Sequence, residues 1–211
     1  MYQVDVASSV DAASVTELRR AALAQSREFS VNDIDKVGWT EIDESSVVLV
    51  VRENDTLVSS MRMITFSDEA AAERFLEYPV TQHSIPGPML TMSRAVTLPN
   101  YFSKGLMGAI RYVYLRGALE TAIQSVVAIV YQGAPRVNSM RRAGFEMLEC
   151  REHWDSEATV SAAPLIGVLP KRLFAQALAH SQFEFSQVIN DCAFNWDAIH
   201  KRFAQVPVLS R

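Results

Sequence analysis

The chain has 211 residues, of which 49% are hydrophobic and 21% are charged, and its formal net charge is −4. This length and composition predict one globular domain with a C-terminal extension, and the negative charge argues against a nucleic-acid-binding protein, which needs a basic face. No stretch approaches the roughly 20 consecutive apolar residues of a membrane span. The first residues lack the basic and apolar regions of a signal peptide, so we expect a cytoplasmic location.

The first third of the chain alternates strand and helix signals. Asp11, Ser14 and Glu17 are arranged as at a helix N-terminus. Two apolar, β-branched runs flank the turn-forming residues 53–55 and predict an antiparallel hairpin. The predicted elements are a strand over 2–6, a helix reaching about residue 27, a structured loop with one helical turn over 29–46, and hairpin strands over 47–51 and 57–66.

The middle of the chain predicts a strand, helix and strand in succession. The helix over 104–122 places apolar or small residues at spacings of three and four, and the segment after it is an apolar strand. The predicted elements are a helix from Asp68 to 78, strands over 89–96, 125–131, 145–150 and 163–169, a helix over 136–144, and C-terminal helices from Pro170 and over 183–203, joined at 180–181.

The order of these elements predicts a mixed sheet flanked by helices, which is an α+β fold. A strand, helix and strand unit crosses over right-handed and makes its two strands parallel, whereas the hairpins are antiparallel.

Several residues resemble the Gcn5-related N-acyltransferase (GNAT) superfamily, in its acyl-homoserine lactone synthase and N-acyl amino acid synthase branch. In that branch an arginine and a phenylalanine precede a tryptophan and acidic residues, then a hairpin arginine, a strand with Glu-x-Ser-Arg, and basic residues before Gly-aromatic. The matching residues of this chain are Arg27, Phe29, Trp39, Glu41, Asp43, Arg62, Thr91-Met92-Ser93-Arg94 and Met140 to Phe145. The resemblance covers residues 18–169. It implies a GNAT-like domain over 1–169, with 170–211 as a helical extension packed on the same domain.

The resemblance implies transfer of an acyl group from a pantetheine thioester to an amine. In this fold the strand over 89–96 separates from its parallel neighbour, so that free peptide groups bind the pantetheine arm. The start of the next helix offers N–H groups to a phosphate. The residues predicted to bind the donor are Ala95, Val96, Ser103, Lys104, Gly105, Gly108, Tyr131 and Arg136.

The donor is either acyl-coenzyme A or acyl carrier protein. The segment 102–108 retains only the glycines and Lys104 of the family's phosphate-binding loop. This favours the carrier protein, whose arm has one phosphodiester, and Lys104, Arg111 and Arg136 would then contact its acidic surface.

For the acceptor, the residue types favour a small amino-acid-like amine. Carboxylates bind an ammonium group, and arginine matches a carboxylate with two parallel hydrogen bonds. The residues predicted to bind the acceptor are Phe29, Trp39, Glu41, Asp43 and Arg62, and those predicted at the catalytic centre are Thr91, Ser93 and Arg94. The base is either a water ordered by Thr91 or Ser93 or a carboxylate from the loop over 29–43. Alternatively, Arg62 and Arg94 only pair with Glu41, Asp43 or Glu120 and brace the sheet.

Two departures from the family pattern leave other functions open. Thr91 stands where the family has glutamate, and Met140 stands where a tyrosine acid is common. The alternatives are an acetyl-coenzyme A-dependent acetyltransferase and a non-catalytic sensor of an acyl thioester or metabolite. The terminal helices either cover the open sheet edge or form a homodimer. The spacing of Cys150, Cys192 and the histidines predicts no metal site.

Overall fold

The structure, a computed structural model, describes residues 1–24, 37–150 and 163–210. Within these residues the strands form one sheet in the order β6-β7-β5-β4-β3-β2-β1-β8, with β9 beside β3. The strands are β1 (Tyr2–Val6), β2 (Val47–Glu53), β3 (Thr56–Phe66), β4 (Met89–Thr97), β5 (Ser125–Tyr131), β6 (Glu146–Glu149), β7 (Pro164–Pro170), β8 (Cys192–Phe194) and β9 (Val208–Leu209). The helices are α1 (Ala12–Leu23), α3 (Glu41–Glu44), α4 (Glu69–Leu76), α5 (Leu106–Leu119), α6 (Pro135–Arg142), α7 (Phe174–Glu184), α8 (Ser186–Asn190) and α9 (Trp196–Gln205).

The sheet is mixed, which confirms the predicted α+β class. β4 and β5 are parallel neighbours joined through α5, whereas β1 to β4 pair antiparallel in succession. On the other side of β5, the strands β7 and β6 are antiparallel. The strand, helix and strand unit therefore stands at the centre of the sheet, with the antiparallel strands β3, β2 and β1 beyond β4 and the antiparallel strands β7 and β6 beyond β5.

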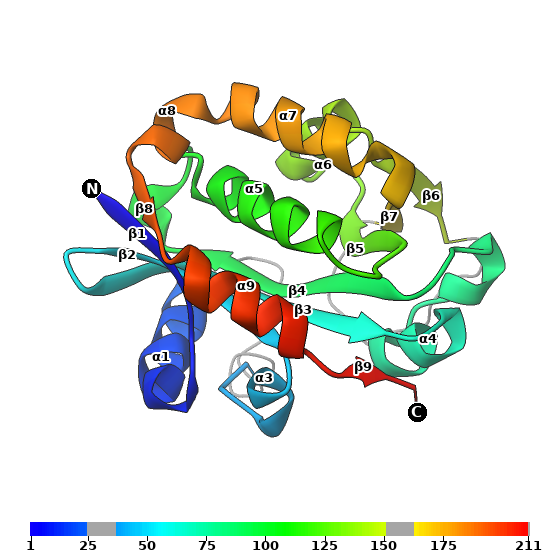
Figure 1. Cartoon of the computed structure of the whole chain (residues 1–211), viewed down its shortest axis with the longest axis horizontal. Coiled ribbons are helices and arrows are strands. Elements are labelled where there is room, and N and C mark those ends of the chain that lie inside the picture. Colours follow the sequence, from blue (N-terminus) through cyan, green and yellow to red (C-terminus); the bar gives the residue numbers. More distant parts are fainter. Residues whose placement is uncertain (25–36, 151–162, 211) are drawn as a thin grey trace.

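The two faces of the sheet bury separate apolar cores. Helices α5 and α7 cover one face and α1, α3 and α4 the other (Figure 1). The α5 face has one large cluster that includes Leu49, Met63, Ile110 and Phe174. On the opposite face, one cluster lies under α1 and another under α4.

The prediction was wrong for the second C-terminal helix. Residues 183–203 do not form one helix, because α7 runs to Glu184 and β8 separates α8 from α9. Residues 180–181, predicted as the joint, lie inside α7. Helix α9 has its own start signal, since the Asn195 side chain accepts a hydrogen bond from the Ala198 N–H at 3.3 Å. The strand is possible because its backbone pairs with β1.

The C-terminal residues thus extend the sheet as well as covering it. β8 pairs parallel with β1 at the sheet edge. β9 pairs parallel with Thr65 and Phe66 of β3, just beyond Val47, the first residue of β2. Side chains from α7, α8 and α9 also join the core on the α5 face. No helix among the described residues has the length and apolar character needed to span a membrane.

Candidate active site

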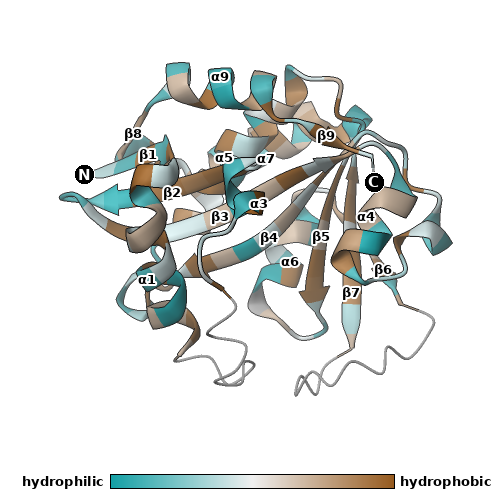
Figure 2. Ribbon diagram, turned by 90° about the horizontal axis from the view of Figure 1, so that it is seen from below, coloured by the Kyte–Doolittle hydropathy of each residue, from teal (hydrophilic) through white to brown (hydrophobic). Residues whose placement is uncertain are grey.

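The parallel strands β4 and β5 separate halfway along their length. Their pairing begins at Met89 with Ser125 and ends at Met92 with Ala128, although β4 continues to Thr97 and β5 to Tyr131. Figure 2 shows the two strands diverging beyond this point. On their outer sides the strands remain paired, β4 with β3 and β5 with β7. The split therefore presents backbone groups of both strands that have no neighbour in the sheet.

A bulge at Arg94 accompanies the split. Ser93 of β4 pairs with Arg62 and Val96 pairs with Ser60, so β4 has one more residue than β3 between these pairs. Arg94 has a φ of 49°, in the left-handed region that non-glycine residues rarely adopt. A bulge bends the strand and increases its twist, which is consistent with β4 turning away from β5 here. Ala95 and Val96, predicted to bind the donor, lie on this bent segment.

The N-terminus of α5 carries the predicted phosphate-binding residues. Ser103 and Gly105 have positive φ values of 64° and 77°, which turn the chain into the helix. Ser103 and Lys104 are exposed. The glycines also have a packing role: a Cβ on Gly108 would lie 2.2 Å from the Phe185 ring, and one on Gly105 would lie 3.1 Å from Val188. Helix α8 and its preceding residue therefore pack closely against this end of α5.

Tyr131 and Arg136 lie at the β5 side of the split. The Tyr131 hydroxyl is 3.1 Å from that of Tyr78, and burial, followed by this hydrogen bond, raises the pKa of Tyr78. Arg136 donates to the carbonyl of Ile129 at 3.5 Å, on the segment of β5 that lies beyond its pairing with β4.

A buried charge cluster lies on the α1 face of the sheet. The Arg19 guanidinium contacts the Asp43 carboxylate at 2.6 Å, and both side chains have no exposed surface. Arg62 Nη1 is 3.7 Å from the other Asp43 oxygen. Burial alone would raise the pKa of Asp43, but the hydrogen bond and charge of Arg19, with the charge of Arg62, lower it below its usual value. Asp43 is thus an anion between two guanidinium groups.

The cluster reaches β4 through Ser93 and Arg94. Arg62 Nε donates to Ser93 Oγ at 3.0 Å, and Arg94 donates to the carbonyl of Gly38 at 2.6 Å. Burial, then the nearby charge of Arg94, lowers the pKa of Arg62 to about 10. Arg62 Nη1 has no hydrogen-bond acceptor among the described residues. This buried cation therefore retains an unused donor close to the bulge of β4.

Sequence reasoning placed Arg62, Ser93, Arg94 and Asp43 at one site, and the structure brings them together. It did not include Arg19. Arg19 lies four residues after Val15 on the buried face of α1, and this spacing could have identified it as a buried charge. Arg27 and Phe29 lie outside the described residues.

Three other predicted residues, Thr91, Glu41 and Trp39, have different surroundings. The Thr91 hydroxyl is buried and donates to the Ile64 carbonyl at 3.2 Å, in the paired part of β4. Glu41 is exposed on α3. Trp39 donates its backbone N–H to Thr16 Oγ1 at 2.9 Å.

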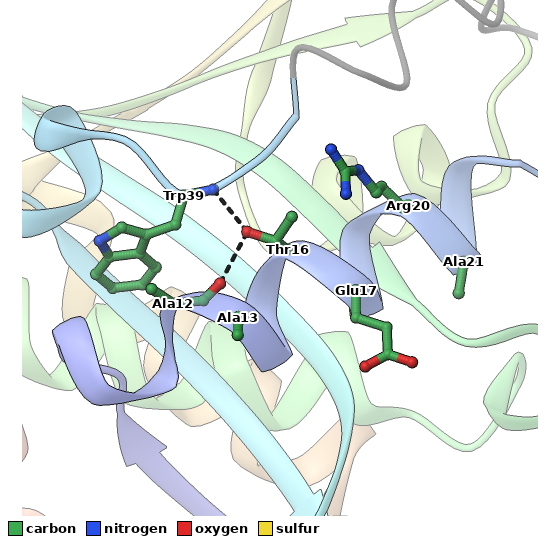
Figure 3. A pocket seen from close by; sticks show the side chains of 7 residues that line it. All are labelled: Ala12, Ala13, Thr16, Glu17, Arg20, Ala21 and Trp39. Atoms are coloured by element: carbon green, nitrogen blue, oxygen red, sulfur yellow. Dashed lines mark hydrogen bonds between the residues drawn. The ribbon is translucent and has the colours of Figure 1, made fainter.

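Trp39 also lines a surface groove of about 550 Å³ along α1 (Figure 3). The lining residues are Ala12, Ala13, Thr16, Glu17, Arg20, Ala21 and Trp39. None of them belongs to β4 or β5, so this groove is distinct from the strand split.

Arg111, predicted to contact a carrier protein, is buried. Its guanidinium donates to Ser139 Oγ at 3.0 Å and lies 4.0 Å from Glu184. The expectation of a surface role for Arg111 is wrong, because it joins α5 to α6 and α7. Among the described residues, no three His, Cys, Asp or Glu side chains form a group that could hold a metal ion.

No protein-family model and no curated protein matches the sequence. Solved structures do match. The acyl-homoserine lactone synthase BjaI, bound to SAM and isopentyl-CoA, is 15% identical with a TM-score of 0.66, covering 96% of this chain and 98% of its own. FeeM, an N-acyl amino acid synthase from uncultured soil microbes, is 13% identical with a TM-score of 0.59, covering 87% and 99%.

The ribosomal-protein-S18-alanine N-acetyltransferase from Escherichia coli is also similar in structure. It is 10% identical with a TM-score of 0.54, covering 81% of this chain and 94% of its own. At such identities the similarity is one of fold, and it agrees with the mixed sheet flanked by helices. The chain therefore has the Gcn5-related N-acyltransferase fold.

Proposed function

We propose that the protein is an N-acyltransferase that moves an acyl group from a pantetheine thioester to a small amino-acid-like acceptor. The observation that carries this proposal is the loss of pairing between β4 and β5 after Met92 and Ala128. An opened pair of strands offers rows of backbone donors and acceptors to the two amides of a pantetheine arm. The fold shared with BjaI, whose structure contains isopentyl-CoA, supports the same assignment.

In the proposed reaction the amine nitrogen attacks the thioester carbonyl carbon. A C–N bond forms, the C–S bond breaks, and the thiolate takes up the proton that the amine loses. A backbone N–H of the bent segment near Ala95 or Val96 would polarise the thioester oxygen, as preorganised donors do in acyl transfer. Ser93, whose hydroxyl accepts from Arg62, would order a water near the amine.

The buried cations favour an acceptor that carries a carboxylate. Arg62 is 5% exposed, and its Nη1 lies 3.7 Å from Asp43 but makes no hydrogen bond with the part of the chain that the structure describes; Arg94 lies on the adjacent bulge. A carboxylate would supply the acceptor that this donor lacks, and a charge-assisted hydrogen bond of this kind is stronger than a neutral one. Asp43 is engaged by Arg19 and Thr40, so its role is to orient the cations rather than to bind the acceptor amine.

The test is a matrix of donors and acceptors followed by mass spectrometry. Acyl-coenzyme A and acyl carrier protein with matched chains would be combined with amino acids and with their carboxamides. We expect an N-acyl product, formed faster from the free amino acid than from the carboxamide. Absence of product with every donor would refute the transferase. Equal rates with both acceptor forms would refute the carboxylate site, and equal turnover of both donors would remove the preference for a carrier protein.

A second candidate is a non-catalytic sensor of the same thioester. Thr91 is committed to the Ile64 carbonyl, and Met140, at the position of the family's tyrosine acid, is only 4% exposed. Donor-dependent thermal stabilisation without product would favour the sensor. Stabilisation by acetyl-coenzyme A but not by longer acyl donors would instead favour an acetyltransferase. The cytoplasmic location and a homodimer remain predictions.

A further inference from the structure

Arg202 connects the C-terminal helix to the short helix that carries Asp43. Its Nε donates to the Ser46 carbonyl at 2.9 Å and its Nη2 to the same oxygen at 2.7 Å. Nη2 also donates to the carbonyl of Glu44. Both carbonyls lie at the C-terminal end of α3, and Arg202 lies more than 150 positions later in the chain. One side chain therefore fixes the end of α3 from the opposite end of the sequence.

Helix α3 needs such support because it has only four residues. A single turn is unfavourable without tertiary contacts, and the last carbonyls of any helix lack partners within it. At its N-terminus the Asp43 carboxylate accepts from the Thr40 N–H at 3.0 Å and from the Thr40 hydroxyl at 3.1 Å. The same carboxylate contacts Arg19 and Arg62. Movement of α3 would thus move the anion that orients the cluster.

The strand that follows α9 lies against the same region. Leu209 accepts from the Ser67 N–H at 2.9 Å, and its side chain packs in the apolar cluster that also contacts Ile42 of α3. β9 pairs with β3 at Thr65, three positions beyond Arg62. The segment from Arg202 to β9 therefore contacts both elements of the cluster: Arg202 bonds the end of α3, and β9 pairs with β3, the strand that carries Arg62.

We propose that Arg202 is a positioning residue for the acceptor: by holding α3 it keeps Asp43, and through it Arg62, in the orientation that binds a carboxylate. This rests on the proposed function. Arg202 itself touches neither the thioester nor the amine. Its loss should weaken acceptor binding and leave the donor site unchanged, because within the described residues the hydrogen bonds of Arg202 go to Glu44 and Ser46 and not to the strands of the split.

The test compares Arg202→Ala, Arg202→Lys and the control Lys201→Ala, which removes one exposed cation from the same helix. Amide hydrogen exchange at Thr40 reports directly on its bond to Asp43. We expect faster exchange at Thr40 and Ser46 in Arg202→Ala, unchanged exchange in α5, and partial recovery in Arg202→Lys. The acceptor KM should rise about tenfold, as for loss of a charged hydrogen bond, with kcat and the donor KM unchanged.

Each result has one consequence for the proposal. Unchanged exchange at Thr40 would overturn it whether or not the protein turns over. A lower kcat with an unchanged acceptor KM would also overturn it, because that pattern indicates lost transition-state stabilisation or fewer active molecules and not weaker acceptor binding. A wild-type protein that makes no product would refute the transferase alone, since exchange at Thr40 still tests whether Arg202 positions Asp43.

Discussion

The Asp43→Asn substitution removes the anion from the buried cluster. Asp43 Oδ1 meets Arg19 at 2.6 Å, and Oδ2 accepts from the Thr40 N–H at 3.0 Å. An asparagine that keeps its oxygen on Arg19 would turn its NH2 group toward the Thr40 donors and Arg62. Removing one partner of a buried ion pair costs about 3–5 kcal/mol, because the remaining charge stays buried without compensation. We expect a loss of about 3 kcal/mol in the free energy of unfolding, measured in urea at neutral pH.

The matched control is Asp11→Asn. Asp11 meets Arg52 at the same distance, 2.6 Å, but these side chains are 20% and 18% exposed. This pair is partly open to solvent, and ion pairs screened by water contribute about 1 kcal/mol or less, so the variant should remain closer to wild type than Asp43→Asn. If the two substitutions cost the same, burial does not govern the Arg19–Asp43 pair, and the description of the cluster as closed to water is wrong.

Three further predictions follow from the same geometry. The pKa of Asp43 is lowered from 3.8 in the folded state, so its ionised form contributes fully to the free energy of unfolding above pH 3.8, and this contribution is lost as the pH falls below that value. The free energies of unfolding of wild type and Asp43→Asn, measured in denaturant, should therefore converge as the pH falls below 3.8. A difference that stays constant with pH would contradict the lowered pKa. Gly108→Ala places a Cβ 2.2 Å from the Phe185 ring and should cost about 1–3 kcal/mol by overpacking, whereas an unchanged midpoint in urea would show that α8 is loosely held. Arg62→Lys keeps the positive charge but loses the planar guanidinium that can donate two parallel hydrogen bonds to a carboxylate, so the acceptor KM should rise about tenfold for amino acids and little for their carboxamides. Equal increases in KM for both acceptors would exclude a carboxylate contact.

The central elements were predictable because their residue patterns are regular. The strand over 125–131 is an unbroken apolar run, and the predicted bounds agree with β5. The hairpin, the Asp68 cap of α4 and the helix after β4 were likewise found from local signals. Periodicity and turn residues act within a few positions, so they are visible in one sequence.

The features that needed long-range contacts were missed or left open. The bulge at Arg94 exists only relative to the register of β3, and β8 becomes a strand only because β1 lies beside it. The pairing of Arg62 with Asp43 was foreseen as one alternative, but the partner of Asp43 on α1 was not. Tertiary contacts override local preference at these positions, and a single sequence does not display such contacts.

The C-terminal strands have a consequence for synthesis of the protein. β8 and β9 pair with β1 and β3, which leave the ribosome long before them. Until residue 209 emerges, β3 has β4 but no second neighbour at Thr65 and Phe66, and until Arg202 emerges α3 lacks the guanidinium on its last carbonyls. A growing chain can assemble its central strands early, yet the region around α3 gains these contacts only after residues 202–209 have emerged. Premature termination near residue 190 would leave the split sheet present without the contacts that organise its charges.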